Sequence, residues 1–185
     1  MLDVTTTALE GVLILEPKRL GDARGFFSEV YNRARFADAG IDVNFVQDNH
    51  SRSALAGTLR GLHFQTPPMA QDKLVRVVRG RVLDVAVDLR RSSPTYGKHV
   101  AADLSAENWR QIFVPKGFAH GFITLTPDTE VVYKVSALFS PEHDLGLAYD
   151  DPDLAIAWPD MPNGLTLSDR DQRHPRLADL PAYFP

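Results

Sequence analysis

The chain contains no cysteine. Disulfide scaffolds, thiolate-bound zinc and cysteine nucleophiles are therefore excluded, and any chemistry must come from His, Lys, Arg, Tyr and carboxylate side chains. An excess of positive charge is also lacking, because 20 Lys and Arg residues are set against 24 Asp and Glu, a net charge of -4. Such a protein has no overall attraction for nucleic acid or an anionic membrane, so an anionic ligand must be held by a local basic site.

Long apolar runs are absent as well. No stretch approaches the ~20 residues of a membrane-spanning helix, and the opening residues MLDVTTTALEG lack the basic head and apolar region of a secretory signal. We therefore expect a cytoplasmic protein with no membrane contact. The 185 residues, 44% of them apolar, can enclose one substantial core and are few for two domains. Since no linker or repeat interrupts them, we predict a single domain over residues 1–185.

Short β-rich runs separated by turn residues dominate the chain. We predict one short helix from Arg33 to Ala39, stopped by Gly40, a tight hairpin at Gly80 and another turn at residues 126–129. Closely spaced strands with few helices predict an all-β antiparallel sandwich or barrel, which can enclose a ligand. The predicted strands cover residues 12–17, 26–32, 43–49, 58–64, 73–79, 81–89, 98–104, 110–115, 121–126 and 130–139.

Alternation along the predicted strands places polar side chains on faces that are otherwise apolar, because residues two apart share a face. Such faces would form a polar-lined pocket inside a barrel. A register error of one residue would reverse each assignment. The residues that share faces are His63 with Gln65, Lys73 with Val75 and Val77, His120 with Phe122, and Tyr133 with Val131 and Val135.

Basic residues gather in two neighbouring segments. Arg60 and His63 lie three residues apart, and Lys73 and Arg76 follow in the next predicted strand. Each alone is compatible with a solvated strand residue or a hydrogen-bonded core histidine. Together, in an acidic protein, they indicate an anionic ligand such as a diphosphate, for which arginine supplies a planar fork of donors.

The segment PKGFAHGF (115–122) has the Pro, Gly and His spacing of the second cupin motif, and residues 57–63 resemble the opening of the first. Metal cupins continue the first motif with a second histidine and a glutamate. This chain has Gln65 at the second histidine, and Met69 and Ala70 where the glutamate would fall. His63 and His120 alone would leave a metal with too few ligands, which disfavours a metal cupin dioxygenase or isomerase.

Seven segments follow one another along nearly the whole chain: RGFFSE (24–29), QDNHS (47–51), RGLHFQ (60–65), residues 71–99, FVPKGFAHGF (113–122), VVYKVS (131–136) and LSDRD (167–171). Together they resemble the dTDP-4-dehydrorhamnose 3,5-epimerases. The resemblance implies a homodimeric cupin-type antiparallel β-barrel (jelly roll) with a few short peripheral helices and neither a metal nor an organic cofactor. It implies conversion of dTDP-4-dehydro-6-deoxy-D-glucose to dTDP-4-dehydro-L-rhamnose by epimerisation at C3 and C5.

The resemblance also assigns catalytic roles. Removing a proton next to a ketone requires a base on one face of the sugar and a cation that stabilises the enolate oxygen. His63 matches the family's base and Lys73 the cation. Asp171 matches the carboxylate that orients the histidine and favours its protonated form, and Tyr133 matches the proton donor on the opposite face.

Further positions match the family's nucleotide and sugar contacts, although barrel packing or a surface ion pair remains the alternative for each. Phe139 replaces a tyrosine that stacks on thymine in many relatives, and a phenyl ring can still stack, contributing ~1–3 kcal/mol. Asp144 and Leu145 replace the Glu and Arg of a common ERG segment, within a divergent stretch over residues 138–154. The matched positions are Arg24, Glu29, Gln47, Asn49, Arg60, Lys73, His120 and Arg170, with Phe27 as a further wall of the site.

Two alternatives remain open at this stage. A 3-epimerase of a deoxysugar pathway would use the same acid and base but invert one centre. A non-catalytic nucleotide-sugar-binding cupin is disfavoured by the joint presence of His63, Tyr133 and Asp171. Neither the organism nor the pathway that takes the product, to a cell-surface polysaccharide or a secreted metabolite, follows from the sequence.

Overall fold

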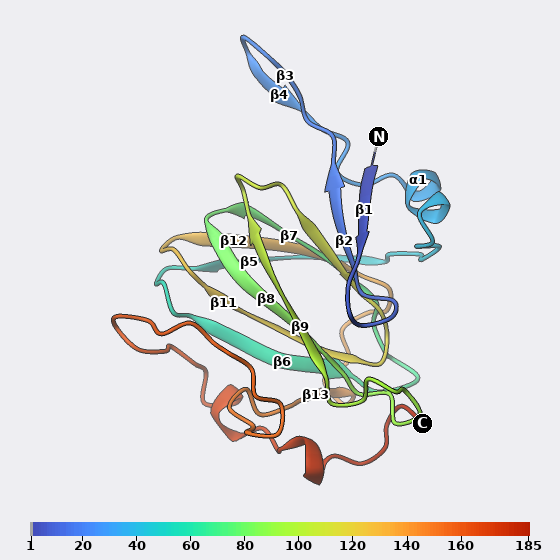
Figure 1. Cartoon of the computed structure of the whole chain (residues 1–185), viewed down its shortest axis with the longest axis vertical. Helices are drawn as coiled ribbons and strands as arrows, with labels where there is room; N and C mark the ends of the chain where they lie inside the picture. Colours follow the sequence, from blue (N-terminus) through green and yellow to red (C-terminus); the bar gives the residue numbers. More distant parts are fainter. Residues whose placement is uncertain (1) are drawn as a thin grey trace.

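A computed structural model describes residues 2–185 (Figure 1). The described part of the chain is mainly β-structure, with one short α-helix and two 3-10 helices, and none of its helices is long and apolar enough to span a bilayer. The strands are β1 (Leu2–Thr6), β2 (Leu13–Pro17), β3 (Leu20–Asp22), β4 (Gly25–Phe27), β5 (Gln47–Ser53), β6 (Leu59–Gln65), β7 (Lys73–Arg79), β8 (Arg81–Asp88), β9 (His99–Ser105), β10 (Gln111–Val114), β11 (Phe118–Thr124), β12 (Thr129–Val135) and β13 (Asp144–Gly146). The helices are α1 (Arg33–Asp38), η1 (Asp171–Arg173) and η2 (Leu177–Asp179).

Two antiparallel sheets form the body of the protein (Figure 1). The six-stranded sheet has the order β1-β2-β10-β7-β12-β5, and the five-stranded sheet has the order β13-β6-β11-β8-β9. A separate two-stranded sheet pairs β3 with β4. The prediction of an all-β antiparallel fold is confirmed.

The main core lies between the two sheets. It is built by strand residues that alternate with outward-facing neighbours, such as Val75 and Val77 of β7, Val82 and Ala86 of β8, and Val131 of β12. Each fully buried valine contributes roughly 1.5–3 kcal/mol of apolar transfer free energy. The face assignments made from alternation are confirmed, because the polar residues on these faces line one pocket, described below.

The outer face of each sheet is covered by a different segment. Phe36 of α1 packs with Leu15 and Leu74 against the six-stranded sheet. Leu177 and Leu180 of the C-terminal segment pack against the five-stranded sheet, with apolar residues of β6 and β8. The C-terminal segment is therefore held beside β6 and β13, where it contributes to the site.

Helix α1 confirms the predicted helix. The Asn32 side chain accepts hydrogen bonds from the backbone N–H groups of Ala34 and Arg35 at the start of the helix. Ala39 is the C-terminal cap, and Gly40 follows with φ +87°. The left-handed conformation at this position favours glycine.

Four predicted strand ranges are wrong at one end or both. The range 26–32 is extended only to Phe27, because Asn32 already caps α1. The range 43–49 is replaced by β5 over Gln47–Ser53, since Val43 and Phe45 pack against the α1 cluster. The strand expected at 121–126 begins at Phe118, and the strand expected at 130–139 ends at Val135. Strands β1, β3 and β13 were not predicted.

The predicted hairpin at Gly80 is also wrong. Strand β7 belongs to the six-stranded sheet and β8 to the five-stranded sheet, so the chain passes from one sheet to the other at Gly80. A Cβ atom on this residue would lie 2.4 Å from Thr129 Oγ1, and φ is +79°. A hairpin and a corner between sheets both favour glycine, and for this reason the sequence does not distinguish them.

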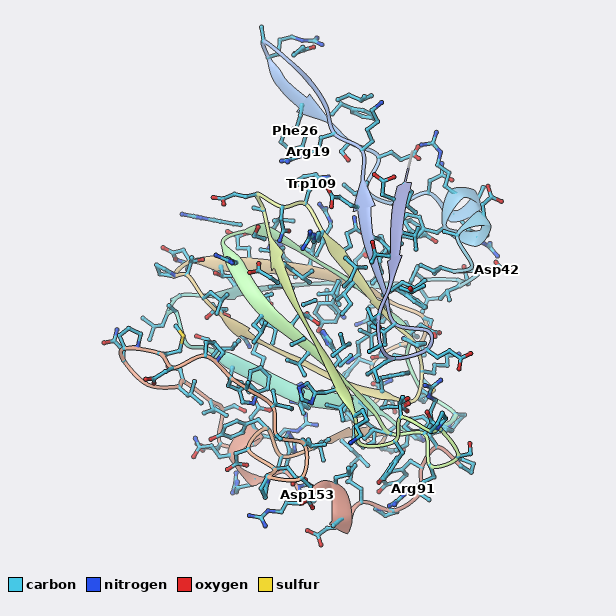
Figure 2. The ribbon with its side chains drawn as sticks, viewed as in Figure 1. Arg19, Phe26, Asp42, Arg91, Trp109 and Asp153 are labelled. Carbon is cyan, nitrogen blue, oxygen red and sulfur yellow. The ribbon has the colours of Figure 1, made fainter. Side chains whose placement is uncertain are left out.

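The β3–β4 hairpin projects from one end of the molecule (Figure 1). At its base the Phe26 ring meets Trp109 edge-on at 4.9 Å between centroids, and the Arg19 guanidinium lies 5.2 Å from the Trp109 ring centroid (Figure 2). The tip of the hairpin is exposed.

Candidate active site

Both sheets contribute to one pocket of about 480 Å³. Strands β6 and β11 of the five-stranded sheet and strands β5, β7 and β12 of the six-stranded sheet supply most of its wall, and the C-terminal segment closes one side. Eleven of the predicted site residues share this wall. They are Gln47, Asn49, Arg60, His63, Lys73, His120, Tyr133, Phe139, Asp144, Arg170 and Asp171.

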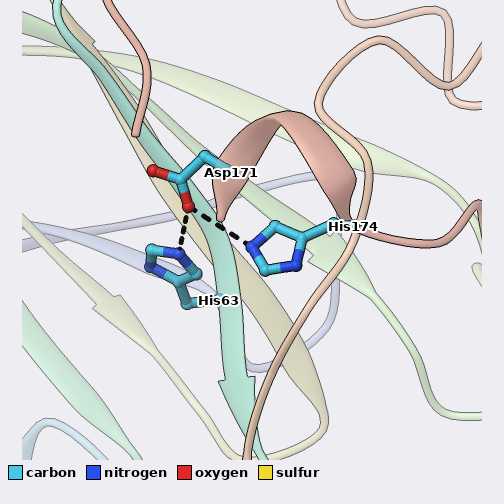
Figure 3. A group of neighbouring side chains, drawn as sticks. All are labelled: His63, Asp171 and His174. Atoms are coloured by element: carbon cyan, nitrogen blue, oxygen red, sulfur yellow. Dashed lines mark hydrogen bonds and ion pairs between the residues drawn. The ribbon is translucent and has the colours of Figure 1, made fainter. Parts of the chain in front are cut away.

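His63 and Asp171 form a close imidazole–carboxylate pair in the pocket wall. His63 Nε2 lies 2.6 Å from Asp171 Oδ1 (Figure 3). Burial opposes ionisation of Asp171, but hydrogen bonds from His63, Ser168 and His174 hold the pKa of this carboxyl at about 2. Because a carboxylate only accepts, Nε2 carries a hydrogen, and Nδ1 of neutral His63 keeps the lone pair of a base.

Lys73 lies in the wall as a buried cation. Its side chain donates from Nζ to the His63 carbonyl oxygen at 3.2 Å. Burial lowers the pKa of Lys73 to about 8, and the charges of Asp144 and Asp84 oppose this shift. The ammonium is therefore mainly protonated at neutral pH, and in this dry position it can stabilise a negative oxygen strongly.

Tyr133 reaches the same pocket from the other sheet. Burial raises the pKa of its phenol, and the nearby charge of Arg60 opposes the rise. The hydroxyl therefore keeps its proton at neutral pH and can donate it. His63 comes from β6 and Tyr133 from β12, so an imidazole and a phenol enter one cavity from opposite sheets.

A second imidazole–carboxylate pair lies deeper in the pocket. His120 Nε2 is 2.9 Å from both oxygens of Asp84, and the Asp84 side chain is fully buried. Asp84 faces inward from β8 with Val82 and Ala86, as alternation along that strand requires. The pair fixes the orientation of the His120 ring in the pocket wall.

Known proteins share the sequence and the fold of this chain over most of its length. The sequence profile of dTDP-4-dehydrorhamnose 3,5-epimerase matches residues 6–179. The chain belongs to this epimerase family. The resemblance drawn from the motifs is thereby confirmed.

Individual members of the epimerase family match over nearly their whole length. The dTDP-4-dehydrorhamnose 3,5-epimerase of Sinorhizobium fredii is 54% identical, over 94% of this chain and 88% of the relative. A crystal structure of the Bacillus anthracis enzyme with TDP and PPi bound has a TM-score of 0.92 and 49% identity, covering 95% of this chain and 99% of that one. The Legionella pneumophila enzyme in complex with dTDP-4-keto-L-rhamnose has a TM-score of 0.94 and 44% identity, covering 98% and 96%. The expected cupin-type fold is confirmed.

Two of the positions where the chain departs from the common family pattern lie on the pocket rim. Phe139 is 56% exposed, and its backbone N–H donates to Gln47 Oε1 at 3.0 Å. Gln47 in turn donates from Nε2 to Asn49 Oδ1 at 2.8 Å. Gln47 therefore links β5 to the loop that presents the Phe139 ring.

Asp144 keeps a charged partner despite its short side chain. Arg170 Nη2 donates to the Asp144 carbonyl oxygen at 3.0 Å, and Nη1 donates to its carboxylate. The arginine comes from the C-terminal segment and Asp144 from β13. The two residues form an ion pair beside Lys73 on the pocket wall.

Three predicted binding residues do not reach the pocket of their own chain. Arg24 and Phe27 lie on the projecting β3–β4 hairpin, where the Arg24 side chain is 90% exposed and Phe27 is 70% exposed. Arg24 pairs with Asp22 of the same hairpin. Glu29 follows the hairpin and forms an ion pair with Arg35 of α1 at 3.0 Å.

Among the described residues, the group that could hold a metal combines His63 of the first cupin motif with Asp171 and His174 from outside the motifs. Gln65 is occupied by backbone groups, since Nε2 donates to the Met69 carbonyl oxygen at 2.7 Å and Oε1 accepts from the Ser140 N–H at 2.7 Å. The nitrogen and oxygen atoms of His63, Asp171 and His174 lie within 4.8 Å of one another, close enough in principle to hold an ion. The Asp171 oxygen is already hydrogen-bonded to both imidazoles.

Sequence reasoning missed several residues of the site. Asp84 could have been found by its inward position between Val82 and Ala86, but it was not selected. Gln71 and Ser168 also line the pocket, and both lie in segments that carry the family resemblance, although no role is predicted for either. His174 follows Asp171 by three residues, and only the turn of η1 brings the two side chains together.

Proposed function

We propose that this protein is a dTDP-4-dehydrorhamnose 3,5-epimerase, which converts dTDP-4-dehydro-6-deoxy-D-glucose to dTDP-4-dehydro-L-rhamnose. The observation that supports this proposal best is the entry of His63 and Tyr133 into one pocket from opposite sheets. Inversion of a carbon requires a base on one side of the sugar ring and an acid on the other. Family membership supplies the substrate.

The proposed reaction begins with proton removal beside the 4-keto group. His63 takes the proton from C5 or C3, and the electron pair of the broken C–H bond forms an enolate. Lys73 stabilises the negative oxygen, because its buried ammonium interacts more strongly with the enolate than with the neutral ketone. Asp171 stabilises the imidazolium that forms at His63.

Tyr133 then gives its proton to the same carbon from the opposite face, which completes the inversion. Water or buffer returns the proton from His63 to the phenolate and resets the pair. The same residues act once at each centre. Arg60 and the Phe139 ring are proposed to hold the diphosphate and the thymine at the pocket entrance.

The proposal includes a homodimer and a cytoplasmic location. The exposed side chains of Arg24 and Phe27 stand away from their own pocket. The binding role implied for them therefore requires that the hairpin of a second copy approaches the pocket. A nucleoside diphosphate sugar is highly charged and is available where nucleotides are made, which favours the cytoplasm.

We expect chelator-treated protein to convert the 4-keto substrate at the same rate as untreated protein, because Lys73 and hydrogen-bond donors stabilise the enolate without a Lewis acid. Proton NMR of the product is the measurement, and it should show inversion at both C3 and C5. Activity that returns only after a divalent metal is added would contradict the metal-free mechanism.

A product inverted at C3 alone would favour the 3-epimerase, and substrate that binds without turnover would favour the non-catalytic protein.

A further inference from the structure

A second histidine lies behind the His63–Asp171 pair. His174 Nε2 is 3.3 Å from Asp171 Oδ1, the same oxygen that lies 2.6 Å from His63 Nε2 (Figure 3). The His174 side chain is 7% exposed and lines a neighbouring pocket instead of the substrate pocket. Any effect of His174 on the reaction therefore passes through the His63–Asp171 pair that it contacts.

The missing side chain of Gly146 leaves the space that the His174 ring occupies. Gly146 of β13 is paired with His63 of β6, so a side chain at position 146 would stand beside the base. A Cβ atom on Gly146 would lie 2.2 Å from both Cε1 and Nε2 of His174. The imidazole occupies this space and meets the His63 ring edge-on, with centroids 5.5 Å apart and planes at 84°.

The backbone around His174 fixes this arrangement. Asp171 begins η1, and its own N–H donates to Ser168 Oγ at 3.1 Å. Directly after His174, the carbonyl oxygen of Pro175 accepts from the Ala148 N–H at 2.8 Å. The two ends of the segment 171–175 are therefore held by hydrogen bonds, Asp171 to the preceding loop and Pro175 to the chain that follows β13.

The protonation of His174 suits a donor to Asp171. Burial lowers the pKa of His174 below its ordinary value, the charge of His63 lowers it further, and Asp171 opposes the shift. A neutral imidazole has one N–H group, and a carboxylate only accepts. The hydrogen of His174 is therefore on Nε2, aimed at Asp171 Oδ1.

We propose that His174 is a positioning residue for the catalytic base, whose ring fills the space left by Gly146 and whose Nε2–H holds Asp171 Oδ1 toward His63. A single oxygen that accepts from two imidazoles on fixed backbones has little freedom to rotate. The inference rests on the proposed epimerase function and adds His174 as a third residue to the His63–Asp171 pair. Wild-type turnover tests that function separately.

The first test compares two substitutions of His174 under identical conditions. His174→Leu removes the hydrogen-bond donor and leaves an apolar side chain of similar size in its place. We expect kcat to fall about 10-fold with KM almost unchanged. His174→Gln places an amide N–H near the position of Nε2 and should restore most of kcat. The matched control is His50→Leu, which breaks an exposed 3.0 Å histidine contact with Glu130 and should leave both constants unchanged.

The pH profile gives a readout that simple loss of packing would not move. Without the His174 donor, the full negative charge of Asp171 faces His63, so the rise of kcat/KM with pH should move to higher pH. The His174→Gln profile should coincide with that of the wild type. The other titratable groups that line the pocket with the pair are the same in all variants. They are Arg60, Lys73, His120, Tyr133, Asp144 and Arg170, and His120 is paired with buried Asp84.

A double-mutant cycle tests the part played by Gly146. The φ of Gly146 lies outside the left-handed region, so alanine at this position would not strain the backbone. Its Cβ atom would instead collide with the His174 ring. Gly146→Ala should therefore lower kcat to about the level of His174→Leu. The double variant should be no worse than either single variant, because both changes disrupt the same contact.

Three results would overturn the inference. The first is a His174→Leu enzyme with wild-type kcat and pH profile, and the second is equal impairment of His174→Leu and His174→Gln. The third is strict additivity of Gly146→Ala and His174→Leu. Each assumes a wild-type enzyme that turns over, since failure of the wild type would overturn the proposed function instead. Binding of dTDP to every variant, measured by calorimetry, excludes misfolding as the cause of a loss.

Discussion

His63→Ala is expected to abolish solvent exchange at both C3 and C5 of the sugar. His63 is the imidazole of the pocket that is paired with the low-pKa carboxylate Asp171, at 2.6 Å. Loss of a positioned general base typically lowers the rate by ~10²–10⁴-fold. Deuterium uptake from heavy water, followed by NMR, measures this loss directly.

Two comparisons make the His63 result interpretable. Asp171→Asn should be less damaging, because the amide can still orient His63 but does not stabilise its protonated form. His50→Ala removes an exposed histidine paired with Glu130 and should have no effect. Exchange near the wild-type rate in His63→Ala would place the base elsewhere, and an equal loss in Asp171→Asn would indicate a more direct role for the carboxylate.

Tyr133→Phe is expected to separate exchange from inversion. The substitution keeps the aromatic ring and removes the proton that completes inversion. His63 can still remove a proton and return one to the same face, so deuterium should continue to enter the substrate with retention of configuration. The amount of inverted product should fall sharply, by ~10²-fold or more.

Both quantities for Tyr133→Phe can be measured by NMR on one sample. The decisive number is the ratio of inverted product to exchanged substrate, because it is insensitive to the amount of active enzyme. A ratio that stays at the wild-type value would remove Tyr133 from the proton transfer. Exchange and inversion that fall together would identify it as a wall of the pocket.

Much of the pocket follows from strand alternation. The sequence places His63 with Gln65, and Lys73 with Val75, on single faces, and the structure turns both faces inward. Short-range periodicity is sufficient here because successive side chains of β6 and β7 point to opposite faces of their sheets. Asp171 has no such signal and was identified by family resemblance alone, since it reaches His63 across 108 residues of sequence.

Other features depend on long-range contacts that local patterns do not contain. A glycine with positive φ, such as Gly80, suits a hairpin as well as the corner between sheets that the structure has. The need for glycine at position 146 arises only because the C-terminal segment places the His174 ring against it. Phe27 matches a family motif, yet its projecting hairpin keeps it from the pocket of its own chain.

The most direct test of the proposed function is incubation of the wild-type protein with dTDP-4-dehydro-6-deoxy-D-glucose in heavy water, with the product analysed by NMR. The two-centre mechanism predicts deuterium at both C3 and C5, with both carbons inverted to give dTDP-4-dehydro-L-rhamnose. Deuterium and inversion confined to C3 would contradict 3,5-epimerisation, and their absence from both carbons would contradict epimerisation altogether.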